Sequence, residues 1–238
     1  MKQVSLHILE NTALAQGIYR LRLGGDVSAV TAPGQFVNIK LDGFFLRRPI
    51  SVCDWQEGEL TLIYKVLGRG TAQMATLPVG AALDVLTGLG NGYNLSPAGE
   101  APLLVGGGVG IPPLYGLAKR LTAQGKRVTA VLGFNCAAEQ FLVEDFRALG
   151  VKVIVLTADG SAGVRGLVTD GMALAQGYSY LYTCGPEAML RAVYDRCVTS
   201  GQFSFEERMG CGFGACMGCS CQTKYGSKRI CTDGPVLV

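Results

Sequence analysis

The chain of 238 residues has very little histidine and few charged residues. Its single histidine, His7, excludes a zinc site that needs two histidines, and it gives little support to Ser-His or Cys-His nucleophilic catalysis. Charged residues make up 16% and the net charge is +3, which is too mild to indicate a nucleic-acid partner. Polar residues interrupt every apolar run before membrane-spanning length, and no signal peptide opens the chain. We therefore expect a soluble cytoplasmic protein without a membrane partner.

Cysteine and glycine, in contrast, are abundant, with nine and 34 residues. Five of the cysteines lie between Cys211 and Cys231. Because cytoplasmic thiols stay reduced, this grouping indicates a metal or redox site rather than a disulfide framework. We predict that Cys53, Cys136 and Cys197 are core residues.

Residues 1–98 show short alternating apolar runs such as GQFVNIKL and ELTLIYKVL, separated by glycine and proline. About six short strands with such breaks predict a small closed antiparallel β-barrel. A β-domain without any ligand is the alternative at this point.

Residues 99–200 alternate apolar strands with helical patterns, which predicts a parallel sheet with helices on its faces. One predicted helix has Leu114, Leu117, Ala118 and Leu121 on a single face. Residues 201–238 form a third piece that is too small to build its own core and therefore needs a staple.

The turn LLVGGGVGIPPL follows the first predicted parallel strand. Its glycines would let the backbone approach a phosphate, with a helix N-terminus behind it. It is not the G-x-G-x-x-G fingerprint, so it indicates phosphate binding without specifying the nucleotide. The candidate residues are Gly106, Gly107, Gly108 and Gly110. The next strand ends in GFNCAAE, which lacks an Arg or Lys to clamp a 2′-phosphate and favours NAD over NADP.

Two further motifs occur in the predicted barrel. In FFLRRPIS, Arg48 either belongs to an exposed charged edge or reaches an anionic phosphate, with the Ser51 hydroxyl nearby. In IYKVLGRGT, Gly70 would open a backbone nest and Thr71 would add a hydroxyl. Neither motif alone is specific for a phosphate-containing ligand. The two motifs in this order, on a barrel that precedes an α/β half, are a more specific signal.

The segments RPIS, IYKVLGRGT, GGGVGIPPL and CGP resemble the ferredoxin–NADP reductase superfamily, in which an FAD-binding barrel precedes a nicotinamide-binding half. Ile50 stands where that family's flavin motif has a tyrosine. The resemblance implies that FAD is held by Arg48, Pro49, Ile50, Ser51, Ile63, Tyr64, Lys65, Gly70 and Thr71. It also implies that Cys184, Gly185 and Pro186 lie near the nicotinamide, although Cys184 could equally be a small buried residue at a strand end.

The C-terminal cysteines have the spacing Cys211-x4-Cys216-x2-Cys219, which is typical of a plant-type [2Fe–2S] loop that needs one more cysteine. A zinc ribbon would need a second C-x2-C pair. The glycines at 210, 212, 214 and 218 would take positive φ and aim N–H groups at sulfur. Cys221 and Cys231 compete for the fourth position: an extended CSCQTK could bring Cys221 to the cluster, whereas Cys231 would close the tail into a loop.

The segments ERMGCGFGACMGCSC and CTDGPV are similar to the electron-transfer subunits of the dihydroorotate dehydrogenase B type. That pattern places the fourth ligand just before Asp-Gly-Pro, so it implies Cys231 and leaves Cys221 spare. It further implies a subunit of pyrimidine biosynthesis that takes electrons from an FMN-containing, dihydroorotate-oxidising partner, through the [2Fe–2S] cluster and FAD, to NAD⁺. A heterotetramer with two copies of each subunit is the implied assembly.

Two alternatives remain open from the sequence. One is the NAD(P)H-oxidising subunit of a sulfide dehydrogenase, a hydrogenase or a bifurcating ferredoxin reductase. The other is a non-catalytic, zinc-stapled nucleotide-binding module. No side chain is expected to act as an acid or a base in the favoured reading, because the cofactors carry the chemistry.

Overall fold

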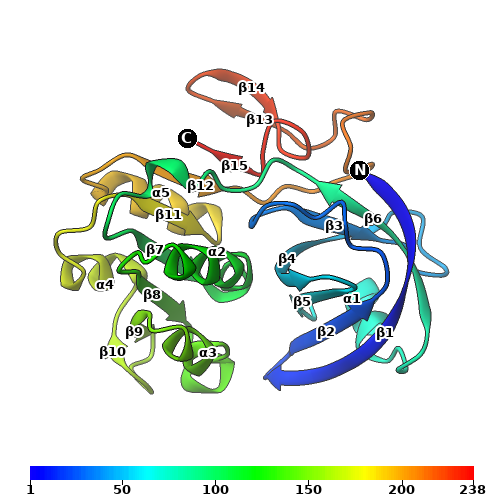
Figure 1. Cartoon of the computed structure of the whole chain (residues 1–238), viewed down its shortest axis with the longest axis horizontal. Helices are drawn as coiled ribbons and strands as arrows, with labels where there is room; N and C mark the ends of the chain where they lie inside the picture. The colour runs from blue at the N-terminus through cyan, green and yellow to red at the C-terminus, as the bar shows by residue number, and fades with distance from the viewer. The chain divides into compact units, whose positions relative to one another are not determined.

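The computed structural model describes residues 1–238, and the chain divides into two compact units (Figure 1). The first contains residues 1–92 together with 206–236, and the second contains residues 93–205 with the last two residues. No helix is both long and apolar enough to cross a membrane.

The first unit is built on a closed antiparallel barrel of six strands in the order β1-β2-β5-β4-β3-β6. The strands are β1 (Lys2–Ala15), β2 (Ile18–Gly24), β3 (Phe36–Ile39), β4 (Arg48–Gln56), β5 (Glu59–Lys65) and β6 (Ala82–Leu89), and helix α1 (Arg69–Ala75) lies between β5 and β6. This confirms the barrel predicted from the short alternating runs. His7 lies on β1 with an exposed side chain.

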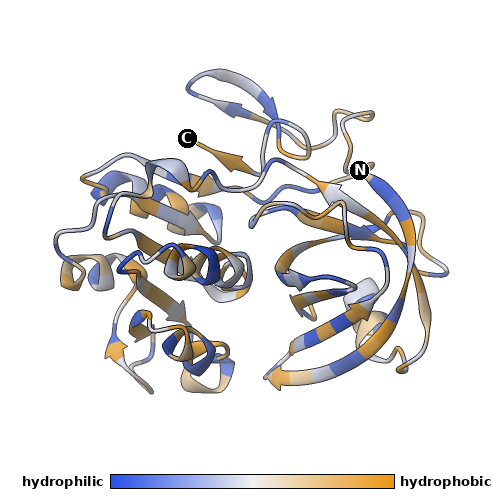
Figure 2. Cartoon of the chain, in the orientation of Figure 1, coloured by the Kyte–Doolittle hydropathy of each residue, from blue (hydrophilic) through white to orange (hydrophobic).

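Alternation explains how these strands build a core. Leu21 and Leu23 of β2 lie opposite Leu62 and Leu60 of β5, and all four are fully buried. Figure 2 shows the corresponding hydrophobic and hydrophilic bands along the barrel strands. Because successive side chains of a strand point to opposite faces, one set fills the barrel and the other faces outward.

The second unit contains a seven-stranded sheet in the order β10-β9-β8-β7-β11-β12-β15. Its strands are β7 (Leu103–Gly107), β8 (Thr129–Phe134), β9 (Lys152–Thr157), β10 (Val164–Arg165), β11 (Leu181–Cys184), β12 (Gly201–Ser204) and β15 (Val236–Leu237). Its helices are α2 (Ile111–Ala123), α3 (Val143–Ala148), α4 (Val168–Leu174) and α5 (Glu187–Arg196), with short 3-10 turns η1 (Ser96–Ala98), η2 (Gly108–Gly110) and η3 (Ala137–Glu139). The strands from β7 to β12 pair in parallel, as the alternation of strands and helices predicts.

Helix α2 follows the glycine-rich turn, with prolines in its first turn where a missing N–H costs nothing. Its buried face contains the four residues predicted from their spacing, Leu114, Leu117, Ala118 and Leu121. The helix thus begins directly behind the turn and fixes its direction.

The C-terminal residues do not form one separate piece. Residues 201–204 are strand β12 of the parallel sheet, whereas residues 206–236, here called the cysteine segment, belong to the same unit as the barrel. The cysteine segment contains one hairpin, β13 (Ser220–Thr223) and β14 (Gly226–Arg229), and is otherwise irregular. We predicted that the C-terminal piece begins at residue 201. In the structure, the cysteine segment begins at residue 206, after strand β12.

Candidate functional site

Two sequence motifs meet on the barrel unit. Arg48 begins β4, and Gly70 lies in the first turn of α1. A Cβ atom built on Gly70 would collide with the Arg48 guanidinium, so the side chain of Arg48 packs directly on the Gly70 backbone. The guanidinium carbon of Arg48 also lies 4.5 Å from the centroid of the Phe44 ring. A preorganised cation therefore stands beside the N-terminal turn of α1.

Thr71 organises that turn. Its hydroxyl accepts hydrogen bonds from the N–H groups of Leu67 (3.0 Å) and Gly68 (3.2 Å) and donates one to the Gly68 carbonyl (3.1 Å). The hydroxyl that we expected to contact a cofactor thus shapes the loop. Ser51 is half-buried on β4, opposite Phe36 of β3.

Tyr64, one of the residues on β5 that we predicted to hold FAD, is buried. The Tyr64 hydroxyl donates to the Asn11 amide oxygen at 3.2 Å, and the ring stacks on Tyr19. Burial raises the pKa of Tyr64 above its usual range. Ile63 is also buried, and Lys65 is half-buried. The Tyr64 side chain is part of the barrel core.

In the second unit, the glycine-rich turn adjoins the Cys-Gly-Pro motif. A Cβ atom on Gly110 would collide with the Cys184 carbonyl, and one on Gly107 would lie 2.5 Å from the Met189 sulfur. Gly106 likewise packs against the first turns of α2. Only Gly108 faces open space, with φ of +51°. Close packing therefore explains three of these four glycines, and Gly108 is the one left free to approach a ligand.

Cys184 ends β11 and is buried, with 1% of its surface exposed. Gly185 is also buried, and Pro186 is exposed just before α5. The buried Tyr93 hydroxyl donates to the carbonyl of Thr183, which precedes Cys184. Burial, together with the nearby Cys184 sulfur, raises the pKa of Tyr93 well above its usual range. The Cys184 thiol thus lies in a buried region beside the Tyr93 hydroxyl.

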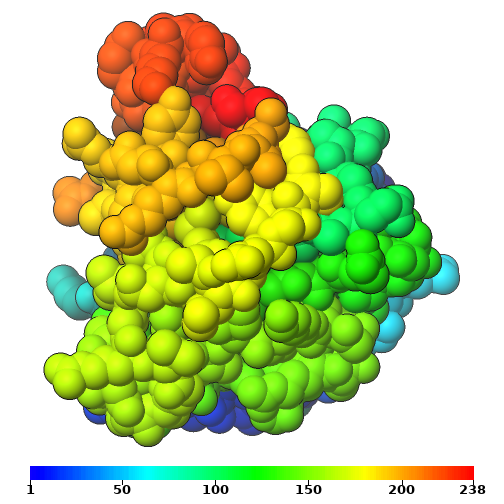
Figure 3. Space-filling model, turned by 90° about the vertical axis from the view of Figure 1, so that its left-hand side faces the viewer, coloured from blue at the N-terminus to red at the C-terminus, as the bar shows by residue number.

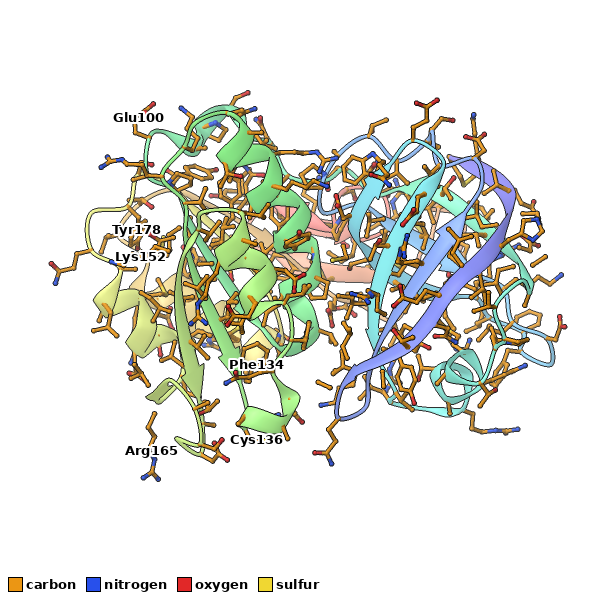
Figure 4. All side chains as sticks on the ribbon, turned by 60° about the horizontal axis from the view of Figure 1, so that its bottom comes forward. Glu100, Phe134, Cys136, Lys152, Arg165 and Tyr178 are labelled. Atoms are coloured by element: carbon orange, nitrogen blue, oxygen red, sulfur yellow. The ribbon has the colours of Figure 1, made fainter.

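The carboxyl edge of the parallel sheet contains the GFNCAAE motif together with two charged residues, Asp159 and Arg165, that no sequence motif indicated. Figure 4 shows Phe134 and Cys136 at the end of β8, and Arg165 on β10 at the same edge. Arg165 is exposed, and its aliphatic chain lies against Gly160, next to Asp159. Hydrogen bonds from Ser161 lower the pKa of Asp159, which keeps it ionised. Ligands of open α/β sheets bind at this edge, so an acidic and a basic group stand where the nucleotide is expected.

In the cysteine segment, backbone N–H groups converge on sulfur. Cys211 Sγ accepts from the N–H groups of Phe213, Ala215 and Cys216 at 3.2–3.5 Å. Cys216 Sγ accepts from Cys211 and Gly218 at 3.4 Å, and Cys219 Sγ accepts from Cys231 at 3.4 Å. N–H groups directed at sulfur stabilise thiolates, which are the form that binds metal.

The sulfurs fall into two pairs, Cys211 with Cys216 and Cys219 with Cys231. Burial would raise the pKa of the Cys211 thiol, but the N–H groups around it and the Cys216 thiol outweigh burial and lower that pKa to about 6. Burial and the adjacent Cys219 sulfur raise the pKa of Cys231 to about 12. No group of three or more His, Cys, Asp or Glu side chains is arranged around one metal ion.

The glycines of the loop serve two different purposes. Gly212 and Gly214 have φ of +80° and +92°, as predicted. Gly210 and Gly218 do not take positive φ; a Cβ atom on either would lie 3.0 or 3.4 Å from Cys216 Sγ, so they allow close approach to sulfur. The third positive φ in this loop, +60°, belongs to Met217.

Cys221 lies on β13, opposite Lys228 of β14. The stretch that we expected to be extended is therefore a strand, and none of the N–H···S contacts described above involves Cys221. The tail beyond Cys231 is fastened to the barrel unit by Asn91, whose side chain bonds both the N–H (3.1 Å) and the carbonyl (2.7 Å) of Val236.

Comparisons with known proteins agree with this arrangement. Residues 206–238 match the family described as the iron-sulfur cluster binding domain of dihydroorotate dehydrogenase B. The chain is 45% identical, over 99% of its length and 96% of the relative's, to the dihydroorotate dehydrogenase B (NAD(+)) electron transfer subunit of Shouchella clausii. It is 46% identical, over 94% and 92%, to the subunit of the same name from Bacillus caldolyticus.

Two solved structures show the same fold. An NADH-dependent reduced ferredoxin–NADP oxidoreductase, described for flavin-based electron bifurcation, matches 98% of this chain and 87% of its own, with a TM-score of 0.89 and 30% identity. The cytochrome b5 reductase domain of Ulva prolifera nitrate reductase matches 84% and 97%, with a TM-score of 0.70 and 16% identity. The latter similarity concerns the fold alone.

Proposed function

The chain belongs to the family of dihydroorotate dehydrogenase B (NAD(+)) electron transfer subunits, and from this premise we propose that it passes electrons from a dihydroorotate-oxidising partner to NAD⁺. A [2Fe–2S] cluster and FAD would be the carriers within this chain. The observation that supports this most directly is that four cysteine sulfurs form two pairs and that backbone N–H groups point at them. These cysteines belong to the same unit as the barrel that contains Arg48.

We assign Cys211, Cys216, Cys219 and Cys231 as the cluster ligands. A [2Fe–2S] cluster takes two protein ligands on each iron, and the two sulfur pairs fit that requirement. The N–H groups of Phe213, Ala215 and Gly218 would remain directed at sulfur and offset the negative charge of the loaded site.

We assign FAD to the barrel residues Arg48, Ser51, Gly70 and Thr71, with backbone contributions from the strand that contains Tyr64. When bound, FAD exchanges a hydride with NAD and single electrons with the cluster, which links two-electron to one-electron chemistry. Arg48 would hold the pyrophosphate through its guanidinium, whose position is already fixed by Phe44 and Gly70. No side chain of this chain would transfer a proton.

We assign the nicotinamide nucleotide to the turn around Gly108 and to the Cys184–Pro186 segment of the second unit. Gly108 leaves its backbone open to a phosphate, and α2 begins directly behind this turn. The preference for NAD over NADP rests on the strand end GFNCAAE and on the NAD(+)-linked relatives, because Asp159 would repel a 2′-phosphate while the adjacent Arg165 would attract one.

The partner would be an FMN-containing catalytic subunit, in a cytoplasmic heterotetramer with two copies of each chain. Electrons that enter through the cluster need a partner surface close to it. The cysteine segment exposes three large apolar side chains, Phe213 (45%), Met217 (58%) and Tyr225 (82%), and its hairpin is drawn at the surface in Figure 3. Exposed apolar groups of this kind are typical of interaction sites.

A second candidate function rests on the likeness to the bifurcating oxidoreductase, which extends over nearly the whole chain. In that case the chain would exchange electrons between NADH and a partner that does not oxidise dihydroorotate. The identity of 45–46% to the dihydroorotate dehydrogenase subunits, against 30%, favours the first function.

The test is to purify the chain alone and with its native partner. Alone, it should contain about one FAD and about two irons and oxidise NADH with an artificial acceptor, but not dihydroorotate. The complex should reduce NAD⁺ with dihydroorotate. If the isolated chain turned over dihydroorotate, the two-subunit assignment would be wrong, and a native partner inactive with dihydroorotate would favour the second candidate.

A further inference from the structure

The outward face of strand β3 contains two buried residues, Phe36 and Asn38. Val37 and Ile39, which alternate with them, belong to the barrel core. Phe36 is 3% exposed and Asn38 is 0% exposed, although both point away from that core. The cysteine segment covers them, because Gly212 approaches both side chains.

Asn38 has a single side-chain hydrogen bond across this contact. Its amide Nδ2 donates to the carbonyl of Cys211 at 3.1 Å, while its Oδ1 is buried without any partner. A buried amide with an unsatisfied oxygen is unfavourable, and a leucine would fill the site without that cost. The one hydrogen bond that the Asn38 side chain makes is therefore the one to the Cys211 carbonyl.

The contact is also tight. A Cβ atom on Gly212 would lie 2.6 Å from Asn38 Nδ2, so the peptide between Cys211 and Gly212 is pressed against the amide. Gly212 has φ of +80°, which lets the chain turn at this point. The first cysteine of the loop is thus held on the barrel at its backbone, while other N–H groups hold its sulfur.

Asn38 lies next to the strand that contains Arg48. In the register of β3 and β4, Asn38 is opposite Pro49, which is flanked by Arg48 and Ile50. Proline has no N–H to give, and the Asn38 backbone carbonyl accepts instead from Arg47 Nη1 at 3.4 Å. One residue therefore connects the cysteine loop to the strand to which we assign FAD.

We propose that Asn38 is a positioning residue that fixes Cys211, and with it the iron–sulfur cluster, at a set separation from the flavin. This rests on the proposed function, which makes Cys211 a ligand and β4 a flavin-binding strand. Electron exchange falls exponentially with separation, so a loop that rocks on the barrel exchanges electrons more slowly. Asn38 acts through the Cys211 carbonyl, to which its amide donates.

The test is Asn38→Leu, which keeps the volume of the side chain and removes the amide. The holoprotein is reduced with NADH in a stopped-flow instrument, and the rates of flavin and cluster reduction are followed separately. We expect normal FAD content and flavin reduction, about tenfold slower electron exchange between flavin and cluster, and a broadened EPR signal of the reduced cluster. Thr87→Val is the matched control: Thr87 is a fully buried polar residue of the same barrel whose hydroxyl bonds only Lys2, and this variant should behave as the wild type.

Unchanged exchange rate and EPR signal in Asn38→Leu would overturn the proposal. If that variant does not fold, Gly212→Ala perturbs the contact from the other side, because its Cβ would push the Cys211 peptide away from Asn38. It should slow exchange in the same way, and a wild-type rate there would also refute the proposal. A wild-type protein without iron would instead contradict the proposed function itself.

Discussion

Replacing Arg48 with alanine should weaken FAD binding strongly while leaving the barrel folded. The guanidinium is half-buried and held over the Phe44 ring, 4.5 Å from its centroid, and against the Gly70 backbone. Its side-chain entropy is therefore already lost before a ligand arrives. A charge-assisted hydrogen bond to a phosphate from such a group contributes about 1.5–3 kcal/mol.

That range converts to a loss of about 10- to 150-fold in FAD affinity. Arg48→Lys should lose an intermediate amount, because lysine keeps the charge but not the planar fork or the stacking on Phe44. Titration of the FAD-free protein with FAD, followed by flavin fluorescence, measures both variants. The thermal unfolding of the FAD-free proteins should differ little, since the hydrogen bonds of the Arg48 guanidinium go to the carbonyls of the two preceding residues, Leu46 and Arg47, and hold no distant part of the chain.

Arg69→Ala is the matched control. Arg69 lies in the first turn of α1, next to Gly70, and is exposed. Its guanidinium carbon lies 6.0 Å from the centroid of the Phe44 ring. The Arg69→Ala variant removes the same charge from the same neighbourhood as Arg48→Ala. We expect it to lower FAD affinity by about fivefold at most. Equal losses for Arg48→Ala and Arg69→Ala would show that general positive charge, not the preorganised Arg48, holds the cofactor, and our reasoning would be refuted.

Four further predictions concern the cysteine segment and the nucleotide. Cys231→Ser should lose iron and distort the EPR signal while Cys221→Ser keeps both, and the reverse result would exchange their roles. In the metal-free protein, alkylation of Cys211 should rise with pH around a midpoint of about 6, because the thiolate that reacts forms above the pKa of this group; a midpoint near 9 would contradict its N–H environment. NADH should give a higher kcat/KM than NADPH, and equal values would remove the argument from the strand end GFNCAAE. Tyr225→Ala should weaken association with the catalytic subunit, measured by sedimentation, at unchanged NADH oxidation; undiminished association would place the interface elsewhere.

The sequence was sufficient for features that depend on local pattern. Period-two alternation predicted the barrel, and the spacing of Leu114, Leu117 and Leu121 predicted the buried face of α2. The glycines of the loop predicted N–H groups directed at sulfur; such groups are present, but among the four glycines only Gly218 supplies one, and the others come from residues such as Ala215. These signals work because the residues concerned interact within one element or one loop.

Features that depend on distant packing could not be read in the same way. The sequence did not show that the glycines at 106, 107 and 110 each make room for a side chain or backbone from α2, α5 or β11. It also did not show that Tyr64 is a core residue bonded to Asn11. Asn38 has no motif at all, since its role depends on a segment 173 positions away.

The tail shows why a local reading of the cysteine segment was incomplete. Its small size predicted that it needs a staple. In the structure, Asn91 binds it through four hydrogen bonds, to Asp233, Gly234 and, twice, Val236, and Pro235 packs against Gly90. From sequence, Asn91-Gly92 looks like an ordinary turn. Asn91 thus fixes the chain just after Cys231, and the hydrogen bond from Asn38 fixes it at Cys211. The barrel thus sets the separation of the outermost two proposed ligands before any metal binds.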